Sequence, residues 1–281
     1  MSADLHIHTT ASDGRLSPQE VIARSYEKGL QIIAITDHDT IDGLLSIQEC
    51  ELPSAKLTVI PGIEFSTDLP HHEVHILGYY IDITNEALHN QLHIIISDRL
   101  DRVQKMIEKL QQLGYNISFR RVMDIAGEAK AVGRPHVAKV LVENGYFPSV
   151  KDAFNGLLEK NGPAYIPHYK LSPEQVIDLI HHAGGLAVLA HPGLVGSDEI
   201  VQQIINHGID GLEVYHPSHD EEQTKKYLSY AENNGLVITG GSDFHAISGR
   251  FPDDLGIFTI PDIIAVKLQQ AVNKRLDIKK D

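Results

Sequence analysis

The sequence lacks several features that would indicate whole classes of protein. Among 281 residues there is one cysteine, Cys50, so no disulfide can form within the chain and a reducing cytosol is the expected compartment. The apolar runs, such as 186–190, are far shorter than the roughly 20 residues that cross a bilayer. No basic segment followed by an apolar stretch opens the chain, so we expect no signal peptide. These absences predict a cytoplasmic protein without a membrane partner.

Positive charge is also scarce. Lys and Arg number 24 against 38 Asp and Glu, which gives a formal net charge of -14. Such a chain has no broad basic surface for long nucleic acid, although a local positive pocket remains compatible with it. The 42% hydrophobic content is that of an ordinary globular protein. No feature indicates an obligate protein partner.

Histidine is abundant, with 17 residues that do not form a run. The first two are His6 and His8, and alternate side chains of a β-strand leave the same face. Ser12-Asp13-Gly14 then ends the strand and places Asp13 on a turn. Two imidazoles and a carboxylate at one strand end are typical metal ligands. Taken alone, two histidines spaced in this way are more often exposed side chains of a strand than metal ligands.

Short apolar strands alternate with helices in both outer parts of the chain. This alternation predicts a parallel, barrel-like α/β sheet with a last strand at 255–260. Between 84 and 165 helical segments follow one another without a convincing strand. We therefore expect a barrel formed by residues 1–83 and 166–281, and a helical insertion formed by 84–165 that acts as a lid or substrate-binding subdomain.

Polar side chains collect where the predicted strands end, which is where α/β barrels carry their catalytic groups. Six histidines and three carboxylates lie there, with no thiolate: His6, His8, Asp13, His38, Glu64, His75, His191, Asp243 and His245. Nitrogen and oxygen ligands suit zinc, manganese or iron. Because an open catalytic ion takes about three protein ligands, nine ligands indicate two or three divalent ions.

These segments resemble the motifs of the PHP (polymerase and histidinol phosphatase) phosphoesterase family. Four motifs are matched in order by 4–14, 35–39, 190–192 and 241–245, and the remaining ligand positions by Pro61-Gly62-Ile63-Glu64 and Val74-His75. The resemblance covers residues 3–82 and 172–275. It implies a distorted (β/α)7 TIM-like barrel with a trinuclear site.

The resemblance also implies how the ligands are shared. In the family's pattern one ion takes His6, His8, Glu64 and Asp243, a second takes Glu64, His75 and His191, and a third takes Asp13, His38 and His245. Glu64 would bridge two ions. We expect manganese, with iron or zinc as alternatives, since all three accept these ligands.

Three further segments, two of them in or next to the inserted region, indicate a particular group of proteins within the family. Segments 133–138, 163–167 and 214–217 resemble stand-alone members of the family that act on nucleoside 3′,5′-bisphosphates and on short RNA 5′ ends. We therefore expect hydrolysis of a phosphomonoester of a small nucleotide by attack of a metal-bound hydroxide. The expected bond is the 3′-phosphate of a nucleoside 3′,5′-bisphosphate such as adenosine 3′,5′-bisphosphate (pAp).

The charge of the site supports a phosphate substrate, because divalent ions would outweigh the three carboxylates and make the site positive within an acidic protein. Arg134 offers a planar fork for a phosphate, with His136 beside it. We expect the substrate to contact Arg134, His136, His216 and Asp13. The expected catalytic residues are His6, His8, Asp13, His38, Glu64, Asp243 and His216.

Other functions stay open. The same site could serve a 5′-3′ exoribonuclease on short 5′-phosphorylated RNA, or a histidinol-phosphate phosphatase. An amidohydrolase-type C–N hydrolase also uses metal ions in a barrel, but no lysine follows a predicted strand here, which counts against it. A metal-stabilised nucleotide-binding module without catalysis would show the same ligands and no turnover.

Overall fold

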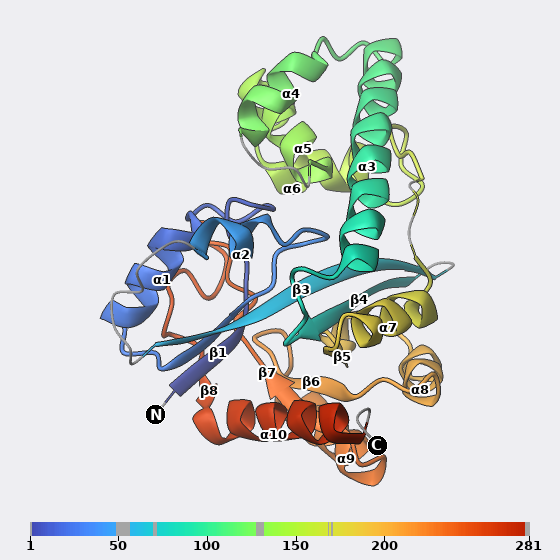
Figure 1. Cartoon of the computed structure of the whole chain (residues 1–281). Coiled ribbons are helices and arrows are strands. Elements are labelled where there is room, and N and C mark those ends of the chain that lie inside the picture. Colours follow the sequence, from blue (N-terminus) through green and yellow to red (C-terminus); the bar gives the residue numbers. More distant parts are fainter. Residues whose placement is uncertain are drawn as a thin grey trace. The chain divides into compact units, whose positions relative to one another are not determined.

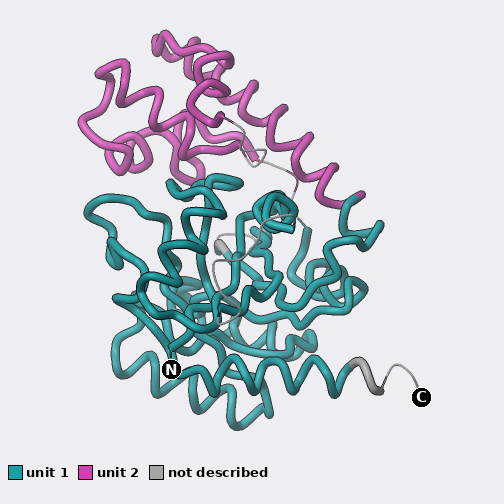
Figure 2. The backbone as a smooth tube through the Cα atoms, turned by 60° about the vertical axis from the view of Figure 1, so that its left-hand side comes forward, with its two compact units in different colours: residues 1–89, 170–281 teal, residues 90–169 magenta. Residues whose placement is uncertain are grey.

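The computed structural model describes residues 2–48, 57–69, 72–127, 132–167, 169 and 171–278, and Cys50 lies outside them. The chain divides into two compact units (Figure 2): unit 1 contains Met1–His89 and Lys170–Asp281, and unit 2 contains Asn90–Tyr169. Among the described residues, no helix combines the length and apolarity needed to cross a membrane.

An eight-stranded sheet forms the centre of unit 1 (Figure 1), in the order β7-β6-β5-β4-β3-β2-β1-β8. The strands are β1 (Ser2–Ile7), β2 (Ile32–Ile35), β3 (Thr58–Leu69), β4 (His72–Tyr79), β5 (Leu186–Leu189), β6 (Gly211–Tyr215), β7 (Val237–Gly240) and β8 (Ile260–Pro261). The end of β1 also meets the segment after β7, where Ile7 pairs with Phe244 and the His8 N–H donates to the Phe244 carbonyl over 2.9 Å. This contact nearly closes the sheet, and the predicted α/β barrel is confirmed.

The strands are not all parallel, contrary to the sequence-based expectation. β1, β2 and β3 pair in parallel, as do β5, β6 and β7. β4 is antiparallel to both β3 and β5. For β3 and β4 the reason is the connection of two residues, which is too short for the crossover that parallel neighbours need. The predicted strand at 255–260 is wrong over most of its length. Gly256, at φ +81°, interrupts the extended backbone, and only Ile260 and Pro261 pair, antiparallel to β1.

Helices follow most strands of unit 1: α1 (Pro18–Glu27), α2 (Asp42–Ile47), α7 (Pro173–His182), the 3₁₀-helix η2 (Pro192–Leu194), α8 (Asp198–Asn206), α9 (Glu221–Asn233) and α10 (Asp262–Ile278). Capping side chains at their first residues explain where two of these helices begin. Ser17 and Glu20 form a capping box around Pro18, and Ser172 and Gln175 form another at α7. The strand residues Leu5, Leu77 and Val188 belong to one buried apolar cluster.

Unit 2 is helical over its described residues. It contains most of α3 (Glu86–Gln112), then α4 (Phe119–Ala126), α5 (Arg134–Glu143), α6 (Val150–Ala153) and the π-helix η1 (Phe154–Leu158). Val103, Met106, Val137, Leu141 and Leu158 are fully buried in a core of its own. The role of this unit as a lid stays a prediction.

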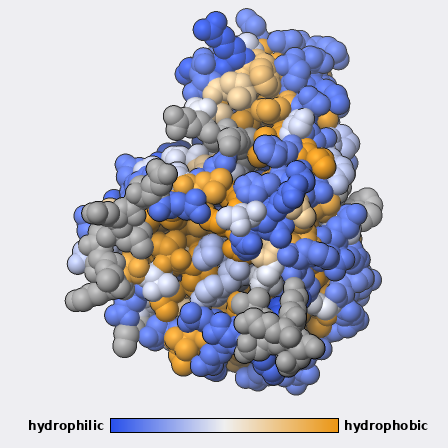
Figure 3. Space-filling model, in the orientation of Figure 1, coloured by the Kyte–Doolittle hydropathy of each residue, from blue (hydrophilic) through white to orange (hydrophobic). Residues whose placement is uncertain are grey.

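Hydrophilic residues cover much of the face shown in Figure 3, interrupted by apolar patches. Inside unit 1 the usual division between polar surface and apolar core breaks down. His6, His8, Glu64 and Glu213 are each 0% exposed. A buried polar group costs free energy unless it is bonded, so this concentration locates the candidate site.

Candidate active site

β1 supplies His6, and His8 follows directly after the strand. The strand is buried along almost its whole length, with Leu5 and Ile7 in apolar clusters and His6 and His8 on the opposite side. Gly241 lies against His6 so closely that a Cβ there would be 2.4 Å from the His6 Cβ. Only glycine fits this approach, which brings the segment after β7 and its Asp243 to the two histidines.

The loop after β1 is held by the buried carboxylate of Asp37. This carboxylate accepts hydrogen bonds from the Thr9 N–H (2.7 Å), the Thr9 hydroxyl (2.7 Å) and the Ser12 hydroxyl (2.6 Å). Three bonds to one carboxylate fix the turn that carries Asp13. The Asp13 Oδ1 consequently lies 3.1 Å from the His245 Nε2.

Glu64, on β3, lies at the centre of the site. Its Oε2 is 3.2 Å from the Nε2 of both His6 and His8 and 3.1 Å from the His38 Nδ1. Its Oε1 is 2.9 Å from the His75 Nδ1 and 3.0 Å from the His191 Nε2. One carboxylate therefore contacts five imidazoles: the four that the family's pattern groups with Glu64, and His38, which that pattern gives to another ion.

Asp243 approaches the same histidines from the segment after β7. Its Oδ1 lies 3.2 Å from the His8 Nε2 and 3.6 Å from the His6 Nε2. Its Oδ2 lies 3.6 Å from the His216 Nε2 and accepts a hydrogen bond from Arg250. The two oxygens thus face different sides of the site.

Three groups of side chains have ligand atoms within 4.8 Å of one another: His6, His8, Glu64 and Asp243; His8, Asp13, His38 and His245; and His38, Glu64 and His75. The first equals the set expected for one ion, and the second adds His8 to the set expected for another. The third contains His38 where the family's pattern has His191, which nevertheless contacts Glu64. The structure brings all nine residues to one site, and their division among ions stays a prediction.

The carboxylates stay ionised despite their burial. Burial acts to raise the pKa of Glu64, but the surrounding imidazoles, led by His38 and His6, hold it well below its usual range. The same holds for the pKa of Asp243, with His245 as the largest opposing charge. Burial acts to lower the pKa of His8, but Asp243 and Glu64 raise it to about 9. In the metal-free site, protons on histidines therefore balance part of the negative charge.

The residues fit divalent ions. The His8 Nε2 lies 3.2 Å from both Glu64 and Asp243, yet it makes no hydrogen bond of acceptable geometry within the described part of the chain. The His38 Nδ1 and Asp13 Oδ1 are likewise buried without a hydrogen bond there. Unbonded polar atoms are costly to bury, and atoms that surround a common point without bonding one another are arranged as the ligands of an ion are. Their nitrogen and oxygen chemistry suits manganese, iron or zinc.

The predicted substrate contacts fall in both units. In unit 1, His216 is 6% exposed and its Nδ1 lies 2.6 Å from the Ser218 hydroxyl. In unit 2, His136 is 2% exposed, and its Nδ1 accepts the Gly133 N–H at the start of α5. Arg134 donates to the Leu158 carbonyl over 3.4 Å, with its guanidinium 5.6 Å from the centre of the Phe154 ring. Substrate contacts of Asp13, Arg134, His136 and His216 stay predictions.

Glu213 was missed by the sequence reasoning. It lies in the middle of β6, fully buried, and its Oε1 is 2.9 Å from the His6 Nδ1. Burial acts to raise its pKa, but His6 and other histidines hold the pKa below its usual range. A signal was present in the sequence, because a glutamate between Leu212 and Val214 interrupts an otherwise apolar strand.

The chain matches a known family. Residues 4–161 match the model of the PHP domain, which is more than half of the 281 residues. The chain therefore belongs to the PHP domain family, and the resemblance seen in its motifs is confirmed.

Similar proteins agree with this assignment. The chain is 36% identical over 248 residues to the 5′-3′ exoribonuclease Rnm of Escherichia coli strain K12, covering 86% of this chain and 84% of that protein. It is 34% identical over 250 residues to the 3′,5′-nucleoside bisphosphate phosphatase of Chromobacterium violaceum, covering 86% and 87%. A crystal structure described as a metal-dependent phosphoesterase, from Bifidobacterium adolescentis, is 32% identical and superposes with a TM-score of 0.85 over 95% of both chains. The protein is thus an enzyme, a metal-dependent hydrolase acting on phosphoester bonds.

Proposed function

We propose that this enzyme removes the 3′-phosphate from nucleoside 3′,5′-bisphosphates such as pAp. The observation that carries the proposal is the set of nine nitrogen and oxygen side chains gathered around Glu64, which fits several divalent ions and therefore a highly charged phosphate. The 34% identity to the C. violaceum bisphosphate phosphatase supports this substrate. A small phosphorylated nucleotide, rather than long nucleic acid, also suits a chain with a net charge of -14.

The nine residues would hold two or three ions, with Mn²⁺ as the first candidate and Fe²⁺ or Zn²⁺ as alternatives. When bound, such ions supply an activated water and positive charge for the phosphoryl oxygens. Glu64 fixes the spacing of the ligand groups, and Asp243 closes one side of the site. We assign His216 as the donor of a proton to the leaving oxygen, because its ring is buried beside Asp243.

The products from pAp test the reaction directly. The purified chain, stripped of metals and reloaded with Mn²⁺, should release inorganic phosphate and leave AMP, identified by chromatography. Adenosine 3′-phosphate as the product would show that the wrong phosphate is removed. Histidinol phosphate, offered at the same concentration, should be cleaved far more slowly.

The role of His216 needs a matched variant. His216→Gln should lower kcat with little change in KM, since a proton donor acts on the reacting bond rather than on substrate binding. His207→Gln changes a histidine that is 40% exposed and paired with Glu174, and it should leave both constants unchanged. Equal effects of the two substitutions would rule out His216 as the proton donor.

A second candidate function is 5′-3′ exoribonuclease activity on short RNA, supported by the 36% identity to E. coli Rnm. A 5′-phosphorylated trinucleotide should then yield mononucleotides released in order from the 5′ end. If one site performs both reactions, pAp and the trinucleotide should inhibit each other competitively. Cleavage of the trinucleotide without any phosphate release from pAp would make the exoribonuclease the primary activity.

A further inference from the structure

Glu213 joins two histidines that belong to different predicted ligand sets. Its Oε1 lies 2.9 Å from the His6 Nδ1, and its Oε2 accepts the backbone N–H of His191 over 2.7 Å. The Glu213 side chain is fully buried, so water does not compete for either bond. These are its two hydrogen bonds within the described part of the chain.

The first bond decides which nitrogen of His6 faces the site. A carboxylate at Nδ1 holds a proton there, which leaves the lone pair of Nε2 directed at the other side of the ring. That nitrogen lies 3.2 Å from the Glu64 Oε2 and 3.6 Å from the Asp243 Oδ1. Glu213 therefore turns the ligating atom of His6 toward the shared carboxylate.

The second bond acts on the backbone of His191. This residue follows β5 with φ 27° and ψ 61°, a conformation that a residue with a side chain seldom adopts. The hydrogen bond to Glu213 holds the His191 peptide in this conformation. The imidazole then reaches Glu64, with its Nε2 3.0 Å from Oε1.

We propose that Glu213 is a shared positioning residue, which couples the two ion positions bridged by Glu64 and leaves the third position independent. The inference rests on the ligand assignment proposed above, in which His6 and His191 serve the two Glu64-bridged ions. Asp13, His38 and His245 serve the third ion. Within the described part of the chain, Glu213 makes no hydrogen bond with any of these three residues.

Glu213→Gln is the matched substitution, because it keeps the shape of the side chain but has one acceptor oxygen instead of two. If the amide oxygen faces His6, the NH₂ group meets the His191 N–H. If the amide is reversed, the NH₂ group donates to Nδ1 and the proton moves to Nε2, where it blocks an ion. Either orientation disturbs one of the two histidines, and because their two expected ions share Glu64, we expect both of these ions to bind about 10- to 100-fold more weakly.

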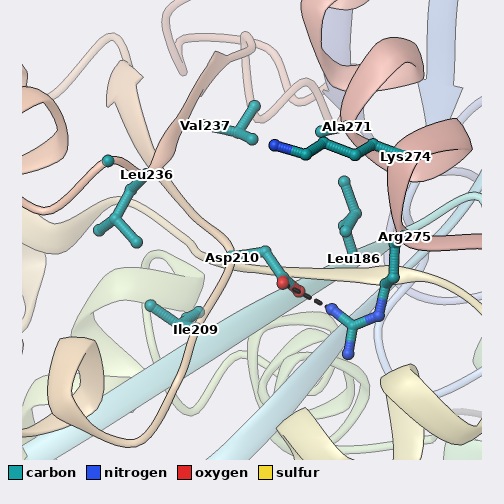
Figure 4. A pocket seen from close by; sticks show the side chains of 9 residues that line it. Leu186, Ile209, Asp210, Leu236, Val237, Ala271, Lys274 and Arg275 are labelled. Carbon is teal, nitrogen blue, oxygen red and sulfur yellow. Dashed lines mark hydrogen bonds and ion pairs between the residues drawn. The ribbon is translucent and has the colours of Figure 1, made fainter. Parts of the chain in front are cut away.

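Asp210→Asn is the control, because Asp210 makes the same two kinds of bond at the opposite end of β5 and β6. Its Oδ2 accepts the Ala187 N–H over 2.8 Å and lies 2.7 Å from the His181 Nε2, while Oδ1 pairs with Arg275 (Figure 4). This variant should fold less stably and bind all ions with unchanged affinity. The comparison separates loss of strand-to-strand bonding from loss of ligand positioning.

The measurement is the stepwise titration of the metal-free full chain with Mn²⁺, followed by calorimetry and by metal analysis after dialysis. Loss of two ions in Glu213→Gln, with the third retained, is the expected result. Wild-type affinity at all positions, equal weakening of all three, or the same change in Asp210→Asn would overturn the proposal. A wild-type chain that binds no ion would contradict the proposed function instead.

A second measurement serves if Glu213→Gln does not fold. In the zinc-loaded wild-type protein labelled with ¹⁵N-histidine, His6 should keep its proton on Nδ1 and bind through Nε2, with the signal assigned by the His6→Asn variant. A proton on Nε2 would overturn the proposal without any use of activity.

Discussion

Two carboxylates of unit 1, Asp210 just before β6 and Glu64 within β3, have opposite surroundings. At the amino end of β6, Asp210 is bonded to His181, to the Ala187 N–H and to the guanidinium of Arg275, so its charge is neutralised by the chain itself. Within β3, the Glu64 side chain is 1% exposed and meets five imidazoles, and no lysine or arginine pairs with it among the described residues. The first arrangement is complete and stabilises the fold. The second is completed by cations from outside, which is how a structural site differs from a catalytic one.

Removal of the Glu64 charge should cause the largest loss of metal binding and activity. In Glu64→Gln the two ion positions that Glu64 is expected to bridge lose a charged ligand. We therefore expect kcat/KM to fall by more than about 100-fold, which exceeds the loss typical of a residue that only supports a ligand. Phosphate release from pAp measures it, with bound metal counted in parallel. Glu221→Gln, whose side chain is 95% exposed, is the control and should match the wild type. A Glu64→Gln enzyme with full metal content and activity would contradict the account.

Removal of the metal ions by a chelator should destabilise the site around Glu64 and leave the bonds of Asp210 unchanged. A ligand held at 100 times its Kd adds about 2.7 kcal/mol to the free energy of unfolding, so stripping even one such ion should lower Tm by roughly 5–10 °C. Differential scanning calorimetry with and without EDTA measures the change. Asp210→Asn should show the same shift on chelation as the wild type, because its own site needs no metal. An unchanged Tm in the wild type would mean that no ion was bound tightly.

Metal affinity at the site around Glu64 should depend on pH. The pKa of His8 in the metal-free site is raised to about 9, and an ion binds only the neutral ring. Affinity should therefore fall as pH drops below 9, about tenfold per pH unit for each proton displaced, and His8 should contribute no dependence above it. Calorimetry in buffers of different ionisation enthalpy counts the protons released at pH 7.5. No release would show that His8 is already neutral.

Asp210→Asn should give the smallest effect. The loss of its charge weakens bonds to His181 and Arg275, side chains that are 19% and 24% exposed, so the free energy of unfolding should fall by about 1–2 kcal/mol. Urea denaturation measures this, with kcat on pAp recorded alongside. Stability should drop while kcat stays constant. A large loss of kcat would show that Asp210 and the site around Glu64 are not independent.

The sequence alone predicted the barrel, a run of helices within residues 84–165 and the nine side chains that meet at one site. Strand ends such as Thr36-Asp37-His38 stand out because polar ligands follow directly after apolar runs. Periodicity could not predict the direction of β4, since a strand reads alike whichever way it pairs. It also gave no warning that the turn at Gly256 replaces most of the last strand.

Sequence patterns do not identify the distant partners through which a residue acts. Glu213 matters because it lies 207 residues from His6 in the chain and 2.9 Å from it in space. Asp37 directly precedes the ligand His38 in the sequence, but its bonds to Thr9 and Ser12 are created only by the folded sheet. The motifs mark the ligands, whereas the groups that orient them are defined by packing.

Crystals of the Mn²⁺-loaded protein, measured at the manganese absorption edge, would show directly whether two ions share Glu64. We expect two or three anomalous peaks, with two of them at bonding distance from different oxygens of Glu64 and the remaining one beside Asp13, His38 and His245. A metal-loaded, active crystal without an anomalous peak at bonding distance from Glu64 would contradict this expectation.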